Sequence, residues 1–238
     1  MEKHIGCLVM PGDVLDCIKP VEENKKVILG PGLIEDGNFI KISKPGILKF
    51  RQPGVYWIDC HQKRYVPAKN DSVIGIITQK PGDIFRVDIG GSELASLSYL
   101  SFEGATKRNR PDVKIGDIVY AKLLVANKDM EPELVCIDSH GRSSGMGVIR
   151  KGGFLFHCHI NLARKLLNPE CVVLKQLGRR FKFEIAVGIN GRVWVKANNE
   201  IQTIAMANAV MASELMNNVQ IETMCKKLSK VSSGIDED

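Results

Sequence analysis

One four-residue segment, Gly188-Ile189-Asn190-Gly191, fits two different kinds of site. It stands between an apolar run, Phe181–Val187, and an alternating run, Arg192–Ala197, and an Asn-Gly step between such runs predicts a tight β-hairpin. The same letters match Gly-x-x-Gly, the loop by which KH domains clamp single-stranded nucleic acid. That clamp joins two helices, whereas this segment joins two predicted strands. We therefore expect its asparagine and glycines to serve backbone geometry, and Trp194 on the following strand to pack in the core. Whether the turn also contacts RNA stays open.

Three basic residues, Lys107, Arg108 and Arg110, lie within four positions of one loop that is bounded by glycine and proline. Such side chains suit phosphate in charge, and guanidinium suits it in geometry as well. In a five-stranded barrel of the oligonucleotide-binding kind, the loops beside the binding face reach the ligand. We expect these three residues to contact RNA, together with Phe85 and Arg86 on the second predicted strand of the barrel.

Signatures of catalysis and of metal binding are missing. The run His157-Cys158-His159 has no second ligand pair nearby in the sequence, and Asp83 and Asp88 have no third carboxylate close by. No phosphate-binding loop, nucleophile elbow or zinc-protease motif occurs. We expect no enzyme activity, no catalytic residue, no metal and no cofactor.

The composition places the protein in a reducing compartment and away from membranes. Its seven cysteines are scattered without a Cys-x-x-Cys pair, which indicates free thiols. No stretch approaches the roughly 18 to 20 apolar residues of a membrane span, and the charged start is unlike a signal peptide. The net charge is +6, and eight basic residues gather between positions 164 and 196 against Glu170 and Glu184. Such a modest, localised charge suits a protein that shares a nucleic acid with partners.

The chain is predicted to be mostly β, with three domains of which the last is α+β. Five Pro-Gly steps in the first 82 residues separate short runs, and an N-terminal β domain is predicted over 1–66. Five strands with turns between them predict an S1-type OB barrel over 67–145, with its third strand in Leu94–Phe102 and its fifth in Glu133–Asp138. Residues 139–145 form the clearest linker.

The C-terminal domain, 146–238, is expected to be of KH type. Its predicted order is strand, short helix, three strands and two helices, and the segment Val172–Leu177 is taken as the second of its four strands. Asn198 or Asn199 is expected to cap the first long helix. The predicted apolar stripe of that helix comprises Ile201, Ile204, Ala205, Ala212, Leu215 and Met216.

Several segments closely resemble the Rrp-forty-type cap subunits of the eukaryotic RNA exosome. They include Gly54–Asp59, Lys63–Pro67, Ser96–Pro111, Val125–Glu133 and Gly188–Val195, and the resemblance covers nearly the whole chain. It implies a non-catalytic RNA-binding subunit that sits on a ring of RNase PH-like proteins beside other cap subunits. Such a subunit binds single-stranded RNA near the central pore and helps to pass its 3′ end to associated exoribonucleases. The same resemblance implies a location in nucleus, nucleolus and cytoplasm.

The sequence departs from generic S1 domains at one step. Their common Gly-Leu-Val-His is here Leu94-Ala95-Ser96-Leu97, so backbone contacts from the Lys107–Arg110 loop are favoured over base stacking on the barrel. Two other hypotheses stay open. One is a free-standing S1/KH RNA-binding factor in ribosome biogenesis or translation, and the other is a metal-dependent nuclease.

Overall fold

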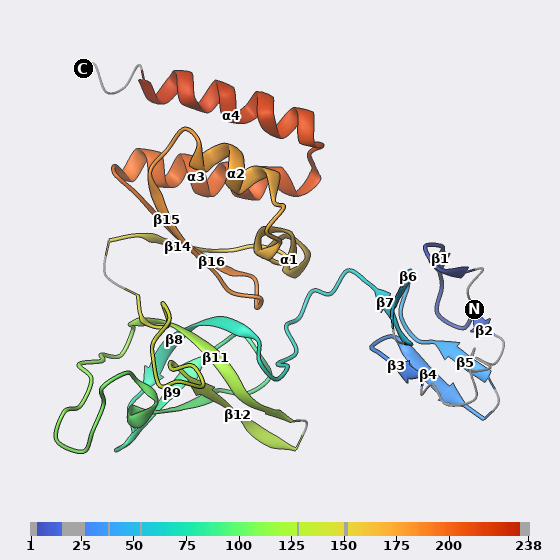
Figure 1. The fold of residues 1–238 in the computed structure, drawn as a ribbon, viewed down its shortest axis with the longest axis horizontal. Coiled ribbons are helices and arrows are strands. Elements are labelled where there is room, and N and C mark those ends of the chain that lie inside the picture. Colours follow the sequence, from blue (N-terminus) through green and yellow to red (C-terminus); the bar gives the residue numbers. More distant parts are fainter. Residues whose placement is uncertain are drawn as a thin grey trace. The chain divides into compact units, whose positions relative to one another are not determined.

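The computed structural model describes residues 4–15, 27–37, 39–52, 54–127, 129–149 and 152–233. The chain divides into two units, Met1–Gln62 and Lys63–Asp238, whose ribbons are drawn in Figure 1. The second unit contains both the predicted barrel and the predicted C-terminal domain, so contacts between those two parts can be described. The first unit is described by itself.

The first unit is made of short strands, as its closely spaced Pro-Gly steps predict. They are β1 (Leu8–Val9), β2 (Val14–Leu15), β3 (Ile28–Leu29), β4 (Leu33–Asp36), β5 (Phe39–Ile42), β6 (Gly46–Arg51) and β7 (Val55–Asp59). One sheet has the order β1-β6-β7-β3 and the other the order β2-β5-β4. Alternate side chains enter the core, among them Ile40 and Ile42 of β5 and Leu48 of β6.

The second unit begins with a closed five-stranded barrel. Its strands are β8 (Ser72–Gln79), β9 (Ile84–Asp88), β10 (Ala95–Ser98), β11 (Ile118–Asn127) and β12 (Met130–Val135). They pair in the order β12-β10-β9-β8-β11, and β11 also pairs with β12, which closes the barrel. The third strand is shorter than predicted, because the Ser98 hydroxyl accepts a hydrogen bond from the Leu100 N–H and starts the 3-10 helix η2 (Tyr99–Ser101). The fifth strand begins before Glu133 and ends before Asp138. A short strand, β13 (Gly147–Val148), pairs with β11.

The C-terminal part packs helices against a three-stranded antiparallel sheet. Its elements are β14 (Phe154–His157), α1 (Ile160–Leu167), α2 (Val172–Gly178), β15 (Phe183–Val187), β16 (Arg192–Ala197), α3 (Glu200–Ala212), η3 (Ser213–Leu215) and α4 (Asn218–Ser233). The strand order is β14-β16-β15. Phe156, Val193 and Val195 face the helices and share one core with Val210 of α3 and Ile221 of α4. The predicted hairpin is confirmed, because β15 and β16 pair through the Asn-Gly step.

The strand predicted over Val172–Leu177 is wrong, because these residues form α2. A six-residue apolar run is ambiguous between helix and strand when its periodicity is the only guide. Val173 and Leu177, four positions apart, are the residues that α2 buries, and α2 packs against α4. Tertiary packing therefore decided the local structure.

The stripe predicted for α3 is also wrong in part. The helix buries Met206, Ala207 and Val210, whereas Ile201 is 60% exposed and Leu215, just beyond the helix, is 93% exposed. The helix is apolar on nearly all sides, so the sequence does not reveal which face meets the core. Asn199 stands at the N-cap position, without a side-chain capping bond.

Candidate nucleic-acid interface

The loop after η2 is closed by its own hydrogen bonds. The Thr106 N–H donates to the Asn109 carbonyl at 3.0 Å, and the Asn109 N–H donates to Thr106 Oγ1 at 3.0 Å. The Asn109 amide also donates to the Gly104 carbonyl at 3.3 Å. These bonds leave Lys107 and Arg108 exposed at the tip, and neither forms an ion pair within the described part of the chain. Two unpaired cations on an ordered tip are suited to bind phosphate.

Arg110 differs from these two residues because it already has partners. Its Nη1 atom lies 2.9 Å from Asp83 Oδ1, on the turn between β8 and β9, and its guanidinium lies 4.9 Å from the centre of the Tyr99 ring. Nearby, Lys80 Nζ donates to the Val113 carbonyl at 3.3 Å. Arg110 therefore joins the loop to the barrel, and any phosphate that it binds competes with Asp83.

The outer face of β9, β10 and β12 offers little to a base. Phe85 is 3% exposed and its ring packs edge-on against Phe102 at 6.2 Å in the barrel core, so the expectation that Phe85 contacts RNA is wrong for this structure. Arg86 points outward but forms an ion pair with Glu131. Its cross-strand neighbour on β10 is Ser96. Because Phe85 is the sole aromatic of these three strands, their outer face provides no stacking platform.

The Gly188–Gly191 turn requires glycine at its last position. Gly191 has φ 80°, and a Cβ atom there would lie 2.5 Å from the Cys158 carbonyl oxygen. The Cys158 N–H donates to the Gly191 carbonyl at 2.7 Å, which holds the two backbones together. The positive φ expected at Asn190 or Gly191 is therefore at Gly191, and a side chain there would also collide with backbone.

Asn190 of this turn binds the barrel. Strand β9 pairs with β8 from Ile76 onward. On the stretch of β8 before that point, Asn190 Nδ2 donates to the Ile74 carbonyl at 2.8 Å and Oδ1 accepts from the Ile74 N–H at 3.3 Å. The same amide donates to the Ile89 carbonyl at 2.8 Å, and the Ile189 N–H donates to the Ser72 carbonyl at 2.9 Å. The turn thus continues the hydrogen bonding of the barrel. The Asn190 amide and the Ile189 N–H bind barrel backbone and are not available to bind RNA.

An ion pair reinforces this contact. Arg192 is 5% exposed, its Nη2 atom lies 2.6 Å from Asp88 Oδ2, and its Nη1 atom donates to the Asp88 carbonyl. Burial acts to raise the pKa of the Asp88 carboxyl, but hydrogen bonds from Arg192 and from the Gly90 N–H outweigh it and hold that pKa below its ordinary value. Arg192 therefore does not belong to the exposed basic surface. Trp194, predicted in the core, is 5% exposed.

Sequence reasoning missed this role of Asn190 and Arg192. The available signal was a polar residue within a glycine turn, and a cation directly after it, between two apolar strands. Neither residue type shows which partner it will meet, because Ile74 and Asp88 are more than a hundred positions away in the chain.

The described residues contain no cluster of three or more histidine, cysteine, aspartate or glutamate side chains that could hold a metal. In the His157-Cys158-His159 run, burial and the charge of Glu214 raise the pKa of the Cys158 thiol to about 11. The thiol is therefore protonated at neutral pH. In the part of the chain that the structure describes, no helix has the length and apolar character needed to cross a membrane.

Comparisons with known proteins agree with this organisation. Residues 7–61 match the N-terminal domain family of mammalian exosome complex component RRP40, residues 65–147 match the S1 domain of exosome complex component RRP40, and residues 153–201 match a KH domain family. Exosome complex component RRP40 of Homo sapiens is 53% identical over 211 residues, which cover 86% of this chain and 77% of the relative. The Drosophila melanogaster RRP40 is 47% identical, with coverage of 93% and 95%. The chain belongs to the RRP40 family of exosome complex components.

More distant proteins are similar to this chain as well. The Saccharomyces cerevisiae RRP40 is 38% identical over 217 residues, which cover 87% of this chain and 88% of the relative. A solved structure at 23% identity superposes with a TM-score of 0.57 over 71% of this chain and 99% of its own. That superposition shows a shared fold.

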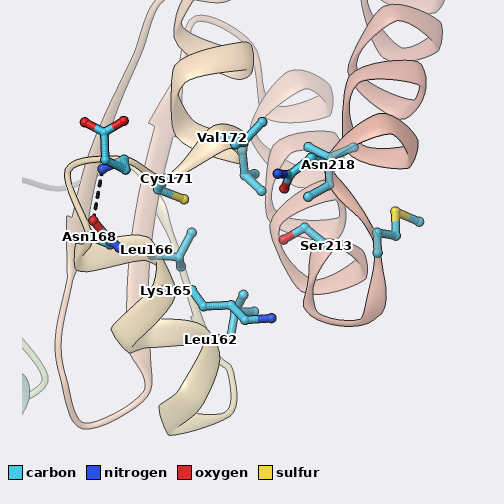
Figure 2. Close-up of a pocket in the computed structure, with 12 residues that line it drawn as sticks. Leu162, Lys165, Leu166, Asn168, Cys171, Val172, Ser213 and Asn218 are labelled. Atoms are coloured by element: carbon cyan, nitrogen blue, oxygen red, sulfur yellow. Dashed lines mark hydrogen bonds between the residues drawn. The ribbon is translucent and has the colours of Figure 1, made fainter. Parts of the chain in front are cut away.

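In this RRP40-family chain, the helix–helix connection of the KH domain lacks the Gly-x-x-Gly clamp. The connection between α1 and α2 is Asn168-Pro169-Glu170-Cys171, which has no glycine and carries an acid. Figure 2 shows it beside a pocket of ≈ 250 Å³ that also meets the start of α4, with the Glu170 N–H donating to Asn168 Oδ1 at 3.0 Å. Glu170 pairs with Lys175 at 2.8 Å. A loop of this kind does not present the backbone that clamps phosphates.

Proposed function

We propose that this protein is a non-catalytic, RNA-binding cap subunit of the RNA exosome. It would bind single-stranded RNA at the entrance of the pore and support 3′-to-5′ processing and degradation by associated exoribonucleases. Membership of the RRP40 family supports this proposal, and the residues that carry it are Lys107 and Arg108, exposed without an ion-pair partner among the described residues at an ordered loop tip of the S1 barrel. Proposed locations are nucleus, nucleolus and cytoplasm, and the proposed domains are 1–66, 67–145 and 146–238.

The proposed partners are RNase PH-like ring subunits and other cap subunits. Large exposed apolar side chains in the first unit support a role in assembly: Leu8 of β1 is 73% exposed and lies directly opposite Ile47 of β6, which is also exposed. Apolar pairs on an outer sheet face are typical of surfaces that a partner protein covers. A co-purification should therefore recover about eight other ring and cap chains, as the resemblance implies. A free-standing RNA-binding factor would come down without them.

Replacing Lys107 and Arg108 together with glutamine should flatten the plot of log affinity against log salt. Each lost phosphate contact lowers the slope by about 0.7, so the pair should lower it by about 1.4. Adding Arg110→Gln should lower the slope further by less than about 0.7, because Arg110 already forms an ion pair with Asp83. The measurement is fluorescence anisotropy of a short single-stranded RNA at several salt concentrations.

The matched control removes two positive charges elsewhere. Lys41 and Lys49 lie on the first unit, in ion pairs with Asp36 and Asp59. Glutamine at both positions should leave the slope nearly unchanged. If the Lys107/Arg108 variant keeps the wild-type slope, the loop does not touch RNA and the proposed interface is wrong.

The purified protein should neither hydrolyse nor phosphorolyse RNA, with or without Mg²⁺, Mn²⁺ or phosphate. The reason is that the described residues contain no group of three or more histidine, cysteine, aspartate or glutamate side chains that could hold a catalytic metal. The check is a gel assay on labelled RNA after stringent purification. Processive degradation that co-elutes with the protein would support the nuclease hypothesis instead.

A further inference from the structure

A second pocket of the KH domain lies away from the α1–α2 connection and from the Gly188–Gly191 turn. The start of β14, the end of β16 and the beginning of α3 enclose ≈ 360 Å³ there, with Phe154, Lys196 and Ile204 among the lining residues. Two other pockets measure ≈ 250 and ≈ 170 Å³. Of these three, the 360 Å³ pocket alone falls in the range of about 300–1,000 Å³ that is usual for small-molecule sites.

The pocket contains an exposed aromatic ring on a rigid support. Phe154 is 43% exposed, and its ring lies nearly parallel to that of Phe156, with centroids 6.1 Å apart and an interplanar angle of 18°. Phe156 is buried in the core and thereby fixes the platform. Ile204, which is 51% exposed, provides a second apolar wall. An exposed flat ring beside an aliphatic wall suits a planar ligand such as a base.

Polar groups at the rim are free to recognise such a ligand. The side chains of Asn198 and Asn199 have no hydrogen-bond partner within the described residues, and each offers a donor and an acceptor. Their backbone is held in place, because Thr203 Oγ1 accepts from the Ala197 N–H at 3.0 Å and donates to the Asn199 carbonyl at 2.9 Å. Amide side chains on a fixed backbone can read the polar edge of a base.

Two of the described residues that line the pocket are charged. Lys196 contributes one positive charge without an ion pair among the described residues, and Glu200 contributes one negative charge. The Lys196 ammonium can bind a phosphate group of the ligand.

We propose that this pocket binds one unpaired nucleotide of an RNA strand, with its base stacked on Phe154, its edge at Asn198 and Asn199, and its phosphate at Lys196. This proposal rests on the proposed function, because it gives the same RNA a second contact. The barrel face lacks a stacking platform, so this pocket supplies the base contact that the barrel does not.

The test compares a short oligouridine RNA with an abasic RNA of the same length, on the full chain. Stacking contributes about 1 to 3 kcal/mol per base, so Phe154→Ala should weaken oligouridine binding about 5- to 150-fold. The same variant should leave abasic RNA binding and the salt slope unchanged, whereas Phe154→Trp should retain affinity.

Phe39→Ala is the control, because it removes a similarly exposed ring from the first unit and should have no effect on RNA binding. In addition, 5-iodouridine RNA should photocrosslink to the peptide that contains Phe154.

Several outcomes would overturn the site. Equal binding of oligouridine by wild type and Phe154→Ala, equal wild-type affinity for oligouridine and abasic RNA, or crosslinks confined to other peptides would each exclude it. Loss of ring assembly in Phe154→Ala with RNA binding intact would show that a protein covers this surface instead. In each case the proposed function would remain supported if the Lys107/Arg108 variant still lowered the slope of log affinity against log salt. Failure of the wild type to bind any RNA would overturn both.

Discussion

Gly191→Val is expected to lower the melting temperature of the protein by about 2–12 °C and to reduce its incorporation into the ring. A non-glycine residue at φ 80° costs about 1–3 kcal/mol, and each kcal/mol shifts the melting temperature of a protein of this size by about 2–4 °C. The added side chain also meets the Cys158 carbonyl oxygen, which belongs to backbone and cannot move aside easily. RNA affinity should fall only in proportion to the folded protein that is lost. Calorimetry and co-purification measure the two effects.

Gly141→Val is the control that separates the cost of a positive φ from the cost of a steric clash with neighbouring atoms. Gly141 has φ 74°, similar to that of Gly191, but a Cβ atom there would have no neighbour within 4 Å. The variant should therefore show the strain cost alone, and Gly191→Val should be the more damaging of the two. A stable, assembled Gly191→Val protein with a specific loss of RNA binding would contradict the structural role of the turn and favour an RNA clamp.

Asp88→Ala is expected to destabilise the contact between the barrel and the KH domain by about 1–3 kcal/mol, since it leaves a buried, charged donor without its carboxylate partner. Here the unpaired group is the Arg192 guanidinium, which is 5% exposed and, among the described residues, keeps only the residue 88 carbonyl as an acceptor. Arg192→Met should cost less, because the partly exposed Asp88 carboxylate can be solvated. Denaturant unfolding of both single variants and of the double variant measures the coupling. The exposed pair of Asp83 and Arg110 is the control, and Asp83→Ala should cost at most about 1 kcal/mol.

The pH dependence gives the same ion pair a second readout. Because the folded pKa of Asp88 is held below its ordinary value, the stability from its charge is complete above about pH 4 and is lost as pH falls through the lowered pKa. Asp88→Asn should remove that part of the acid sensitivity. Equal costs for Asp88→Ala and Arg192→Met, together with an unchanged acid profile in Asp88→Asn, would show that the pair does not hold the two domains together.

Local patterns were sufficient for much of the fold. The Asn-Gly hairpin and the turns at Pro11-Gly12 and Pro31-Gly32 depend on neighbouring residues only, and the structure has them. Pro45-Gly46 instead leads directly into β6, and Pro53 lies outside the described residues. Predictions were wrong where an apolar segment had no distinctive period. Val172–Leu177 formed a helix, and α3 turned Ile201 and Ile204 outward, because packing against distant elements decided both.

The sequence by itself determined the order and kind of the three domains, the basic loop and the need for glycine in the turn, because these follow from short-range backbone and charge preferences. Only the tertiary structure decided what those residues touch. Phe85 is buried in the core, and Arg110 forms an ion pair with Asp83. Lys107 and Arg108 form no ion pair within the described residues. Asn190 and Arg192 bind the barrel. The physical reason is that hydrogen bonds and ion pairs between residues a hundred positions apart depend on how the chain closes upon itself, which no local pattern encodes.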